Sequence, residues 1–354
     1  MLMSNLTRED PRAMRLPADH PSVPAAKVGL LLMNLGTPEG TDYWSMRRYL
    51  SEFLSDRRVI DLNPMWWDFL LHFVILSKRP FTSGRAYRSI WNEELDESPL
   101  RTITRSQAEL LSGRLAARYP ELVVDWAMRY GKPSIRTVLE RMGTAGCSRI
   151  VLLPLYPQYA GSTMATAYDK AFDALKRMNW QPAIRTAPPY HDEPLYIEAL
   201  ARSIEVHLAT LDFEPEVVIT SFHGLPKRYL TEKGDPYHCQ CHKTNRLLRE
   251  RLGWSAERLP ITFQSRFGSE EWLQPYTDAT VRALAEQGVR RLAILAPGFS
   301  ADCVETLEEL CEEVKEEFLD AGGERFSYIP CLNDSEDGLD VIETVALREL
   351  QGWL

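Results

Sequence analysis

The sequence predicts an α/β protein with two parallel sheets, each of four strands flanked by helices. Eight short apolar segments alternate with longer segments of helical period, which is typical of parallel sheets with helical crossovers. The chain has 354 residues, of which 44% are hydrophobic and 26% charged, so it is long enough for two domains and a large core. The eight strands divide into two sets of four.

The strand candidates are short and aliphatic, and they are placed at 29–34, 123–127, 150–154, 184–187, 217–220, 261–264, 292–295 and 326–329. Helical periodicity marks 106–119, 135–142, 165–178, 196–211, 243–252, 277–287 and 304–319. No G-x-G-x-x-G motif follows a strand, and the segment 36–40 is short and interrupted by proline. A dinucleotide site is therefore a weak interpretation.

Four regions follow from this order. Residues 1–25 are polar and punctuated by proline, so we expect a mobile tail. We expect a first domain at 26–173, a second at 174–332, and a C-terminal helix at 333–354 that packs back on the first domain.

Charge and hydropathy exclude several classes of protein. The chain has 41 basic and 50 acidic residues, a formal charge of −9, which argues against a nucleic-acid binder that relies on a basic surface. No apolar run is long enough to span a bilayer, and no signal peptide is recognisable. We therefore expect a cytoplasmic protein whose six cysteines are reduced.

One cluster has the residue types of a metal site, the HCQCH segment at 238–242. Its C-x-C spacing differs from the C-x₂-C of a structural zinc site, and no second pair is evident. A metal site is the less favoured interpretation of this segment.

An acidic segment follows the strand at 292–295. Glu305, Glu309 and Glu313 are spaced i, i+4 and i+8, so a helix would align their carboxylates along one face. Glu305 would lie near the carboxyl end of the strand, where open α/β sheets bind ligands. A solvated acidic face and a path for a divalent cation both fit this pattern.

His223 follows the apolar strand at 217–220, again at the carboxyl end. A histidine at this place can accept a proton near neutral pH, and it can equally be a structural hydrogen-bonding group. Glu305 at a comparable edge favours the catalytic interpretation.

Several separated blocks together resemble the ferrochelatases, the family that inserts ferrous iron into a porphyrin in the last stage of haem synthesis. The blocks are LLMNLGTP at 31–38, MRYG at 128–131, LYPQY at 155–159, SFHGLP at 221–226, GDPY at 234–237, FQSRFG at 263–268, WL at 272–273 and the segment 302–310. The resemblance covers about residues 28–335 and implies two similar Rossmann-like domains around an active-site cleft.

The resemblance also implies roles for residues of this chain. His223 would accept the pyrrole protons with Glu305 as its partner, while Glu309 and Glu313 would relay protons outward or iron inward, so that all four can contact the metal. Leu35, Tyr156, Trp272 and Phe299 would pack against the porphyrin, Arg129 and Tyr130 would line the opposite wall, and Ser162 would bond a propionate. An ordinary core explains these wall residues about equally well. Cys303 stands where some relatives have histidine.

The segment 64–81 is unusually aromatic, and a buried helix is one explanation. In the resembled family the matching segment is a mobile apolar lip over the cleft that also touches the membrane. Trp66 and Phe69 would cover the macrocycle, and Arg79 would meet propionates or lipid phosphates. The apolar part is too short to span a bilayer but long enough to lie on one.

The implied substrates are a porphyrin and Fe²⁺, with no cofactor required. A [2Fe–2S] cluster is not expected, because Gly161 replaces one family ligand and no cysteine follows Cys331. The aromatic lip favours protoporphyrin IX; coproporphyrin, insertion of cobalt or nickel, and a non-catalytic porphyrin or haem carrier are the alternatives. Contacts with the inner membrane and with the preceding enzyme of the haem pathway stay open. We also expect a π-bulge in the helix that begins at Cys303, because such bulges gather at functional sites.

Overall fold

The computed structural model describes residues 19, 26–61 and 63–354, so the tail predicted at 1–25 lies outside the described residues except for Asp19. The first sheet contains β1 (Lys27–Gly36), β2 (Leu122–Tyr130), β3 (Cys147–Pro154) and β4 (Ala183–Thr186). The second contains β5 (Val217–His223), β6 (Ile261–Gln264), β7 (Arg291–Leu295) and β8 (Arg325–Ile329). The strand prediction is therefore confirmed, with β4 ending one residue early.

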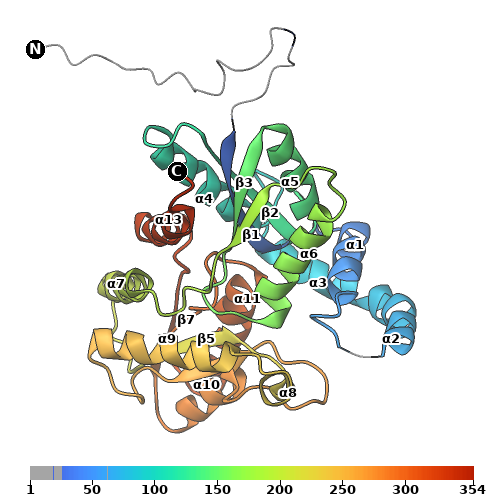
Figure 1. Cartoon of the computed structure of the whole chain (residues 1–354). Coiled ribbons are helices and arrows are strands. Elements are labelled where there is room, and N and C mark those ends of the chain that lie inside the picture. Colours follow the sequence, from blue (N-terminus) through green and yellow to red (C-terminus); the bar gives the residue numbers. More distant parts are fainter. Residues whose placement is uncertain (1–18, 20–25, 62) are drawn as a thin grey trace, which may run out of the picture.

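The two sheets repeat one topology. Their strand orders are β2-β1-β3-β4 and β6-β5-β7-β8, and every pairing is parallel. Figure 1 shows one sheet above the other, with α11 (Val304–Leu307) between them. Because the carboxyl ends of parallel strands share one edge, each sheet offers such an edge for a site.

The predicted boundary after residue 173 needs a correction. β4 pairs with β3 from Arg149↔Ala183 to Leu152↔Thr186, so it belongs to the first sheet. A boundary at 173 would separate this strand from its hydrogen-bonding partner. The first sheet therefore includes β4, and the boundary between the two halves lies after Thr186.

Helices cover both faces of both sheets. In the first half they are α1 (Tyr43–Leu54), α2 (Pro64–Leu70), η2 (Leu71–Ile75), α3 (Leu76–Ser89), α4 (Pro99–Ala116), α5 (Ile135–Thr144), η3 (Gly161–Ala165) and α6 (Thr166–Leu175). In the second they are α7 (Pro194–Thr210), α8 (Lys227–Thr231), α9 (Tyr237–Leu252), α10 (Thr277–Glu286), α11, η4 (Glu309–Val314) and α12 (Lys315–Asp320), followed by α13 (Glu336–Leu350). The segments η2, η3 and η4 are π-helical.

Local sequence signals explain several helix starts. Ser98 caps α4 by accepting a hydrogen bond from the backbone N–H of Arg101, and Pro99 occupies the first turn. Asp42 caps α1 through the N–H groups of Trp44 and Ser45. Ser335 caps α13 in the same way.

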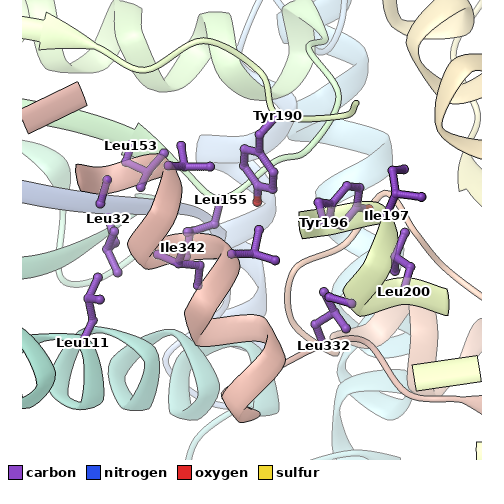
Figure 2. Close-up of a cluster of buried hydrophobic side chains, with 14 of the residues drawn as sticks. Leu32, Leu111, Leu153, Leu155, Tyr190, Tyr196, Ile197, Leu200, Leu332 and Ile342 are labelled. Carbon is purple, nitrogen blue, oxygen red and sulfur yellow. The ribbon is translucent and has the colours of Figure 1, made fainter. Parts of the chain in front are cut away.

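One hydrophobic cluster joins the two halves. It contains Leu32 and Leu153 from the first sheet, Val218 and Ala293 from the second, and Ile342 of α13. Figure 2 shows α13 beside Leu32 and Leu153, with Ile197 and Leu200 of α7 on the other side. α13 packs against α4, β3 and α7, so the C-terminal helix helps to hold the halves together.

Candidate active site

His223 is the last residue of β5, and its register partner on β6 is Gln264. Its imidazole is half-buried, and Nδ1 lies 2.7 Å from the carbonyl oxygen of Gly224. Because a carbonyl oxygen can only accept, Nδ1 carries the proton and donates it to this bond. In its neutral form the ring then presents Nε2 as the acceptor, which is the tautomer a proton acceptor needs.

Gly224 fixes the backbone beside this histidine. Its N–H donates to the carbonyl oxygen of Gln264 over 2.8 Å. A Cβ at position 224 would lie 2.8 Å from that oxygen and 3.1 Å from Cε3 of Trp272. The close approach of strand and indole therefore requires glycine here.

Glu305 lies on α11, and Gln264 connects it to His223. The side-chain amide of Gln264 donates to the backbone oxygen of Glu305 over 2.7 Å and to Oε2 of Glu309 over 3.2 Å. The Glu305 side chain is half-buried and lies near Tyr49 and Tyr87. Burial first, and then the nearby carboxylate of Glu305, raise the pKa of Tyr49.

Glu309 is held more firmly than a solvated acid. The backbone N–H of Ser265 donates to its Oε1 over 2.8 Å, and the Ser265 hydroxyl donates to Oε2. Burial raises the pKa of Glu309, whereas the bonds from Ser265 and Gln264 and the charge that His223 carries when protonated act against that rise. Gln264, the strand partner of His223, thus bonds to the backbone of Glu305 and to the carboxylate of Glu309, and the charges of His223 and Glu305 both act on Glu309.

The predicted π-bulge is confirmed, and it changes the expected acidic face. The helix is α-helical at Val304–Leu307, π-helical at Glu309–Val314 and α-helical again from Lys315. The N–H of Glu313 bonds to the carbonyl of Glu308 over 3.2 Å, a five-residue step. The wide turn lies between Glu308 and Glu313, so Glu313 does not stand at the i+8 position relative to Glu305 that a regular α-helix would give it.

Glu308 is an additional acidic residue at this turn that the spacing argument missed. Burial, followed by the charges of Glu313, Glu312, Glu309 and Glu305, raises the pKa of Glu308 to about 7. Glu313 is exposed, and partial burial together with neighbouring acids raises its pKa as well. A carboxyl group that titrates near neutrality can take up and release a proton at working pH.

The predicted wall residues divide into two groups. Leu35 and Phe299 pack on one buried cluster with Met128, Ala301 and Cys303, close to the start of α11. Tyr156 and Trp272 are buried, yet the Tyr156 hydroxyl and Trp272 Nε1 have no hydrogen-bond partner among the described residues. Buried polar groups without partners are rare and often mark a ligand surface.

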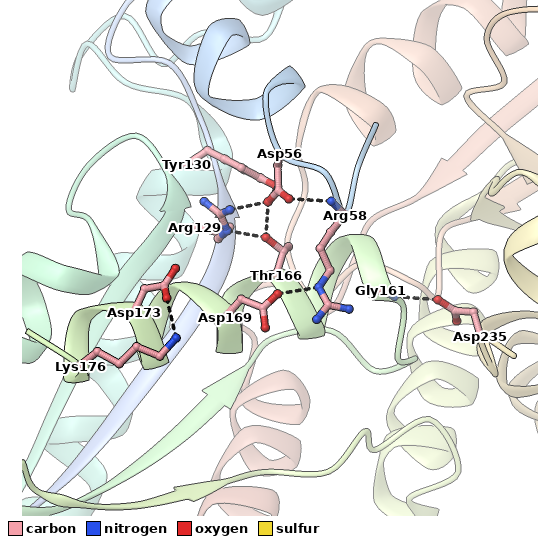
Figure 3. Close-up of polar contacts among 10 residues, drawn as sticks. All are labelled: Asp56, Arg58, Arg129, Tyr130, Gly161, Thr166, Asp169, Asp173, Lys176 and Asp235. Atoms are coloured by element: carbon pink, nitrogen blue, oxygen red, sulfur yellow. Dashed lines mark hydrogen bonds and ion pairs between the residues drawn. The ribbon is translucent and has the colours of Figure 1, made fainter. Parts of the chain in front are cut away.

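Arg129 and Tyr130 are held by Asp56, a residue that the sequence did not indicate (Figure 3). Arg129 forms an ion pair with Asp56 and donates from Nε to Thr166 over 2.6 Å, while the Tyr130 hydroxyl donates to Asp56 over 2.8 Å. Burial opposes ionisation of Asp56, but the bonds from Thr166 and the Arg58 N–H and the charge of Arg129 keep its pKa below the usual value. Tyr130 is fully buried, so its predicted role as a cleft wall needs correction: it supports Asp56.

An open cavity of about 1290 Å³ lies beside this group, and its lining includes Asp56, Arg58, Arg129 and Gly161. Neither His223 nor Glu305 lines it, so this cavity and the titratable cluster are separate features. Ser162 is half-buried in η3, next to Gly161, whose N–H donates to Asp235 over 2.7 Å (Figure 3).

The aromatic segment is exposed, so the buried-helix interpretation is wrong. Trp66, Phe69 and Phe73 are 76%, 57% and 70% exposed. Trp66 and Phe69 are thus largely open to solvent in this structure, and their contact with a macrocycle stays a prediction. Trp67 instead turns inward and donates from Nε1 to the Leu54 carbonyl over 2.7 Å.

Arg79 follows on α3 and contacts the second half of the molecule. Its guanidinium lies 5.9 Å from the ring centre of Phe267, and both residues line a cavity of about 510 Å³ with Trp67. Among the described helices, none combines the length and the apolar character needed to cross a membrane.

Residues 27–350 match the family model described as Ferrochelatase. A protein named Ferrochelatase from Allorhizobium ampelinum is 61% identical over 339 residues, which are 96% of this chain and 98% of the relative. Proteins of the same name from Agrobacterium fabrum and Rhizobium meliloti are each 60% identical and are 98% covered. Among solved structures, SirB from Bacillus subtilis with Fe³⁺ is similar in fold, with a TM-score of 0.52, 11% identity and coverage of 92% of this chain and 94% of SirB.

Proposed function

The chain belongs to the ferrochelatase family, and from that membership we propose that it inserts Fe²⁺ into protoporphyrin IX and releases two protons to give protohaem. As a metal chelatase of this kind it would be a lyase. The observation that carries the proposal is the fixed tautomer of His223, whose strand partner Gln264 bonds to the backbone of Glu305 and to the carboxylate of Glu309.

Charge balance dictates the chemistry. One dication enters the macrocycle and two pyrrole protons leave, so the site needs a base near the ring centre and a route for protons. His223 takes a proton at Nε2, with Glu305 as its partner across the Gln264 contact. Glu309 stabilises the resulting imidazolium, because its carboxylate is held in place by Ser265.

The acids of η4 and Glu308, the residue just before it, complete the route. Glu308 titrates near neutral pH and Glu313 is exposed, so together they connect the half-buried cluster to solvent. Carboxylates bind Fe²⁺ weakly enough to pass it on, which suits delivery as well as proton release. Iron is a substrate here, and we propose that the enzyme needs no cofactor or iron–sulfur cluster.

Tyr156, Trp272, Leu35 and Phe299 would form the apolar walls, with the unpartnered Trp272 Nε1 and Tyr156 hydroxyl facing the macrocycle. Arg129 Nη1 is buried without a hydrogen-bond partner among the described residues, and it would meet a propionate, as would Ser162. The exposed aromatic residues of α2 and η2 would rest on the surface of the inner membrane, on the cytoplasmic side. There the product of the preceding haem-pathway enzyme would be within reach.

His223→Ala tests the proposal. We expect it to remove most Fe²⁺ insertion under anaerobic conditions, because no other imidazole has been placed in this cluster, while protoporphyrin binding survives. Turnover should be measured by haem absorbance and binding by porphyrin fluorescence quenching. Retained turnover in the variant would contradict the role of His223. If the parent chain binds porphyrin but shows no turnover, and the variant binds porphyrin equally well, the protein is a carrier.

The same assay distinguishes the substrates. Protoporphyrin IX and coproporphyrin should be compared side by side, since they differ in the number of carboxylates that the cleft must meet. We expect protoporphyrin IX to react faster, because the exposed aromatic segment fits the less polar macrocycle. Faster reaction of coproporphyrin would reassign the substrate but leave metal insertion in place.

A further inference from the structure

His238 and His242 lie one turn apart on α9, outside the candidate active site. Their Nε2 atoms are 3.1 Å apart, and their ring centres are separated by 4.3 Å. His238 is half-buried and His242 is exposed, so solvent reaches the pair. The proposed metal insertion uses neither residue.

The separation of the two nitrogens suits a shared cation. Two metal–nitrogen bonds of about 2.0–2.1 Å put the nitrogens about 3.3 Å apart at a tetrahedral angle and about 2.9 Å apart at a right angle. The observed 3.1 Å lies between these values, so a cation needs only a small adjustment of the rings. The i, i+4 spacing on one helix face keeps both rings on the same side.

The aromatic ring of Phe263 packs against both histidines. The Phe263 ring centre is 5.7 Å from that of His238, with 17° between the planes, and 6.3 Å from that of His242. Phe263 is almost fully buried on β6. The imidazoles therefore rest on a fixed apolar surface, and ordering them around a cation costs less side-chain entropy than it would for free side chains.

The neighbouring cysteines do not complete a four-ligand site. Cys239 follows His238 directly and is turned away by about 100° around the helix, as the period of 3.6 residues requires. Cys241 is fully buried. Among the described residues, no group of three or more histidine, cysteine or acidic side chains is arranged to hold a metal, so water would supply the remaining ligands.

We propose that His238 and His242 form a two-histidine site for a borderline divalent cation of the Zn²⁺, Cu²⁺ or Ni²⁺ class. Imidazole ligands suit these ions, and Fe²⁺ stands below all three in the usual order of affinity. The site would therefore discriminate against the ion that serves as the proposed substrate. The inference stands on this geometry and is independent of the proposed function.

The position of the pair gives the bound cation a structural effect. Gln240, between the two histidines, accepts a hydrogen bond from the backbone N–H of Tyr159 over 2.7 Å. Asp235, just before α9, accepts from Gly161. A cation that bridges residues 238 and 242 restrains the turn that holds the 159–161 segment of the first half.

Zn²⁺ binding to the full chain tests the site. Equilibrium dialysis should use a His223→Ala parent, so that the active-site imidazole does not contribute. We expect His238→Gln and His242→Gln each to weaken Zn²⁺ binding at least tenfold. His207→Gln, which removes a partly buried histidine bonded to Ser327, is the matched control and should leave binding unchanged. Unchanged binding in both α9 variants would overturn the proposal and leave only a hydrogen bond between two neutral rings.

Two further measurements keep the result interpretable if a variant is less stable. Electron paramagnetic resonance of bound Cu²⁺ should show coupling to two imidazole nitrogens in the parent, and this coupling should disappear in the double variant. Its persistence there would overturn the assignment. Anaerobic Fe²⁺ should bind at least tenfold more weakly than Zn²⁺, and equal binding would overturn the proposed class of ion.

Discussion

At the scale of single residues, His223 owes its position to its neighbours on two strands. The Gly224 carbonyl sets its tautomer, and Gln264 joins the next strand to Glu305 and Glu309. The chemistry of the imidazole therefore depends on backbone geometry that no single side chain supplies.

Gly224→Ala should disturb this geometry. The added methyl group would lie 2.8 Å from the Gln264 carbonyl, so β5 must shift and carry His223 with it. We expect kcat for Fe²⁺ insertion to fall at least tenfold and the free energy of unfolding to fall by about 1–3 kcal/mol. Steady-state assays and urea titrations measure the two effects.

Gly143→Ala is the control for that substitution. Gly143 lies in α5, and an added Cβ would meet nothing within 4 Å. Alanine is the better helix former, so we expect unchanged kcat and a gain in stability of up to about 1 kcal/mol. Equal loss of activity in both variants would show that His223 does not depend on Gly224.

Glu308 predicts a pH dependence of stability. Because its pKa is raised to about 7 in the folded protein, the folded state holds a proton that the unfolded state has already released. The stabilisation that protonated Glu308 gives the folded state is complete below about pH 4.5 and is lost as the pH rises through about 7. Tm should therefore fall between pH 5 and pH 8, and Glu308→Gln should flatten that fall.

Scanning calorimetry across this range, with the exposed Glu324→Gln as control, checks the prediction. Glu324→Gln should retain the slope of the parent chain. An unchanged slope in Glu308→Gln would mean that another group titrates in this window.

Sequence reasoning selected His223 and Glu305 as candidates because both follow buried strands at the edge where parallel sheets bind ligands. It missed Glu308, because its significance comes from the π-turn, which departs from the regular i, i+4 spacing. It also missed Asp56, whose importance arises from contacts with Arg129, Tyr130 and Thr166, distant in the chain. Side chains that act through long-range contacts leave no local pattern.

At the scale of elements, strands were easier to predict than helix starts. The eight apolar segments matched because buried parallel strands are continuously hydrophobic. α4 begins seven residues before the predicted start at 106, at a Ser98-Pro99 cap signal that the periodicity argument did not use. α9 begins at Tyr237, six residues before the predicted start at 243, because polar residues of the HCQCH segment form its first turn.

The exposed segment formed by α2 and η2 predicts membrane binding. Replacing Trp66 and Phe73 together by serine removes two of its most exposed aromatic rings. We expect binding to vesicles of mixed zwitterionic and anionic lipids to weaken at least tenfold, with little change in Fe²⁺ insertion in detergent. Vesicle sedimentation measures the binding.

Trp180→Ser is the matched control, because Trp180 is also an exposed aromatic residue but lies between α6 and β4. It should bind vesicles as the parent does. Equal loss in the control, or no loss in the double variant, would show that the segment is not the lipid contact.

At the scale of the whole molecule, the cluster shared by both sheets predicts joint unfolding. Ile342→Ala removes a buried side chain of α13 that contacts this cluster, and should lower the free energy of unfolding by about 2–4 kcal/mol. Tryptophan fluorescence and far-ultraviolet circular dichroism should report one coincident transition. Val206→Ala, at an exposed position, should change the free energy of unfolding by no more than about 0.5 kcal/mol.

Separate transitions for the two probes would mean that the halves unfold independently. The sequence indicated two sets of four strands, but the shared cluster could not be predicted from periodicity. It depends on how α7 and α13 pack between the sheets, and the position of β4 was misassigned for the same reason: pairing partners are set by tertiary structure.

The cluster around Ile342 also determines where the two halves can part. Apolar contacts join them along α7 and α13, where ion pairs such as Arg114–Asp340 and Arg202–Asp337 also lie, whereas on the far side Asp61 forms ion pairs with Arg228 and Lys233. Added electrolyte weakens exposed ion pairs but leaves apolar contacts in place. High salt should therefore loosen the rim at Asp61 more than the side at α13, which would act as the hinge.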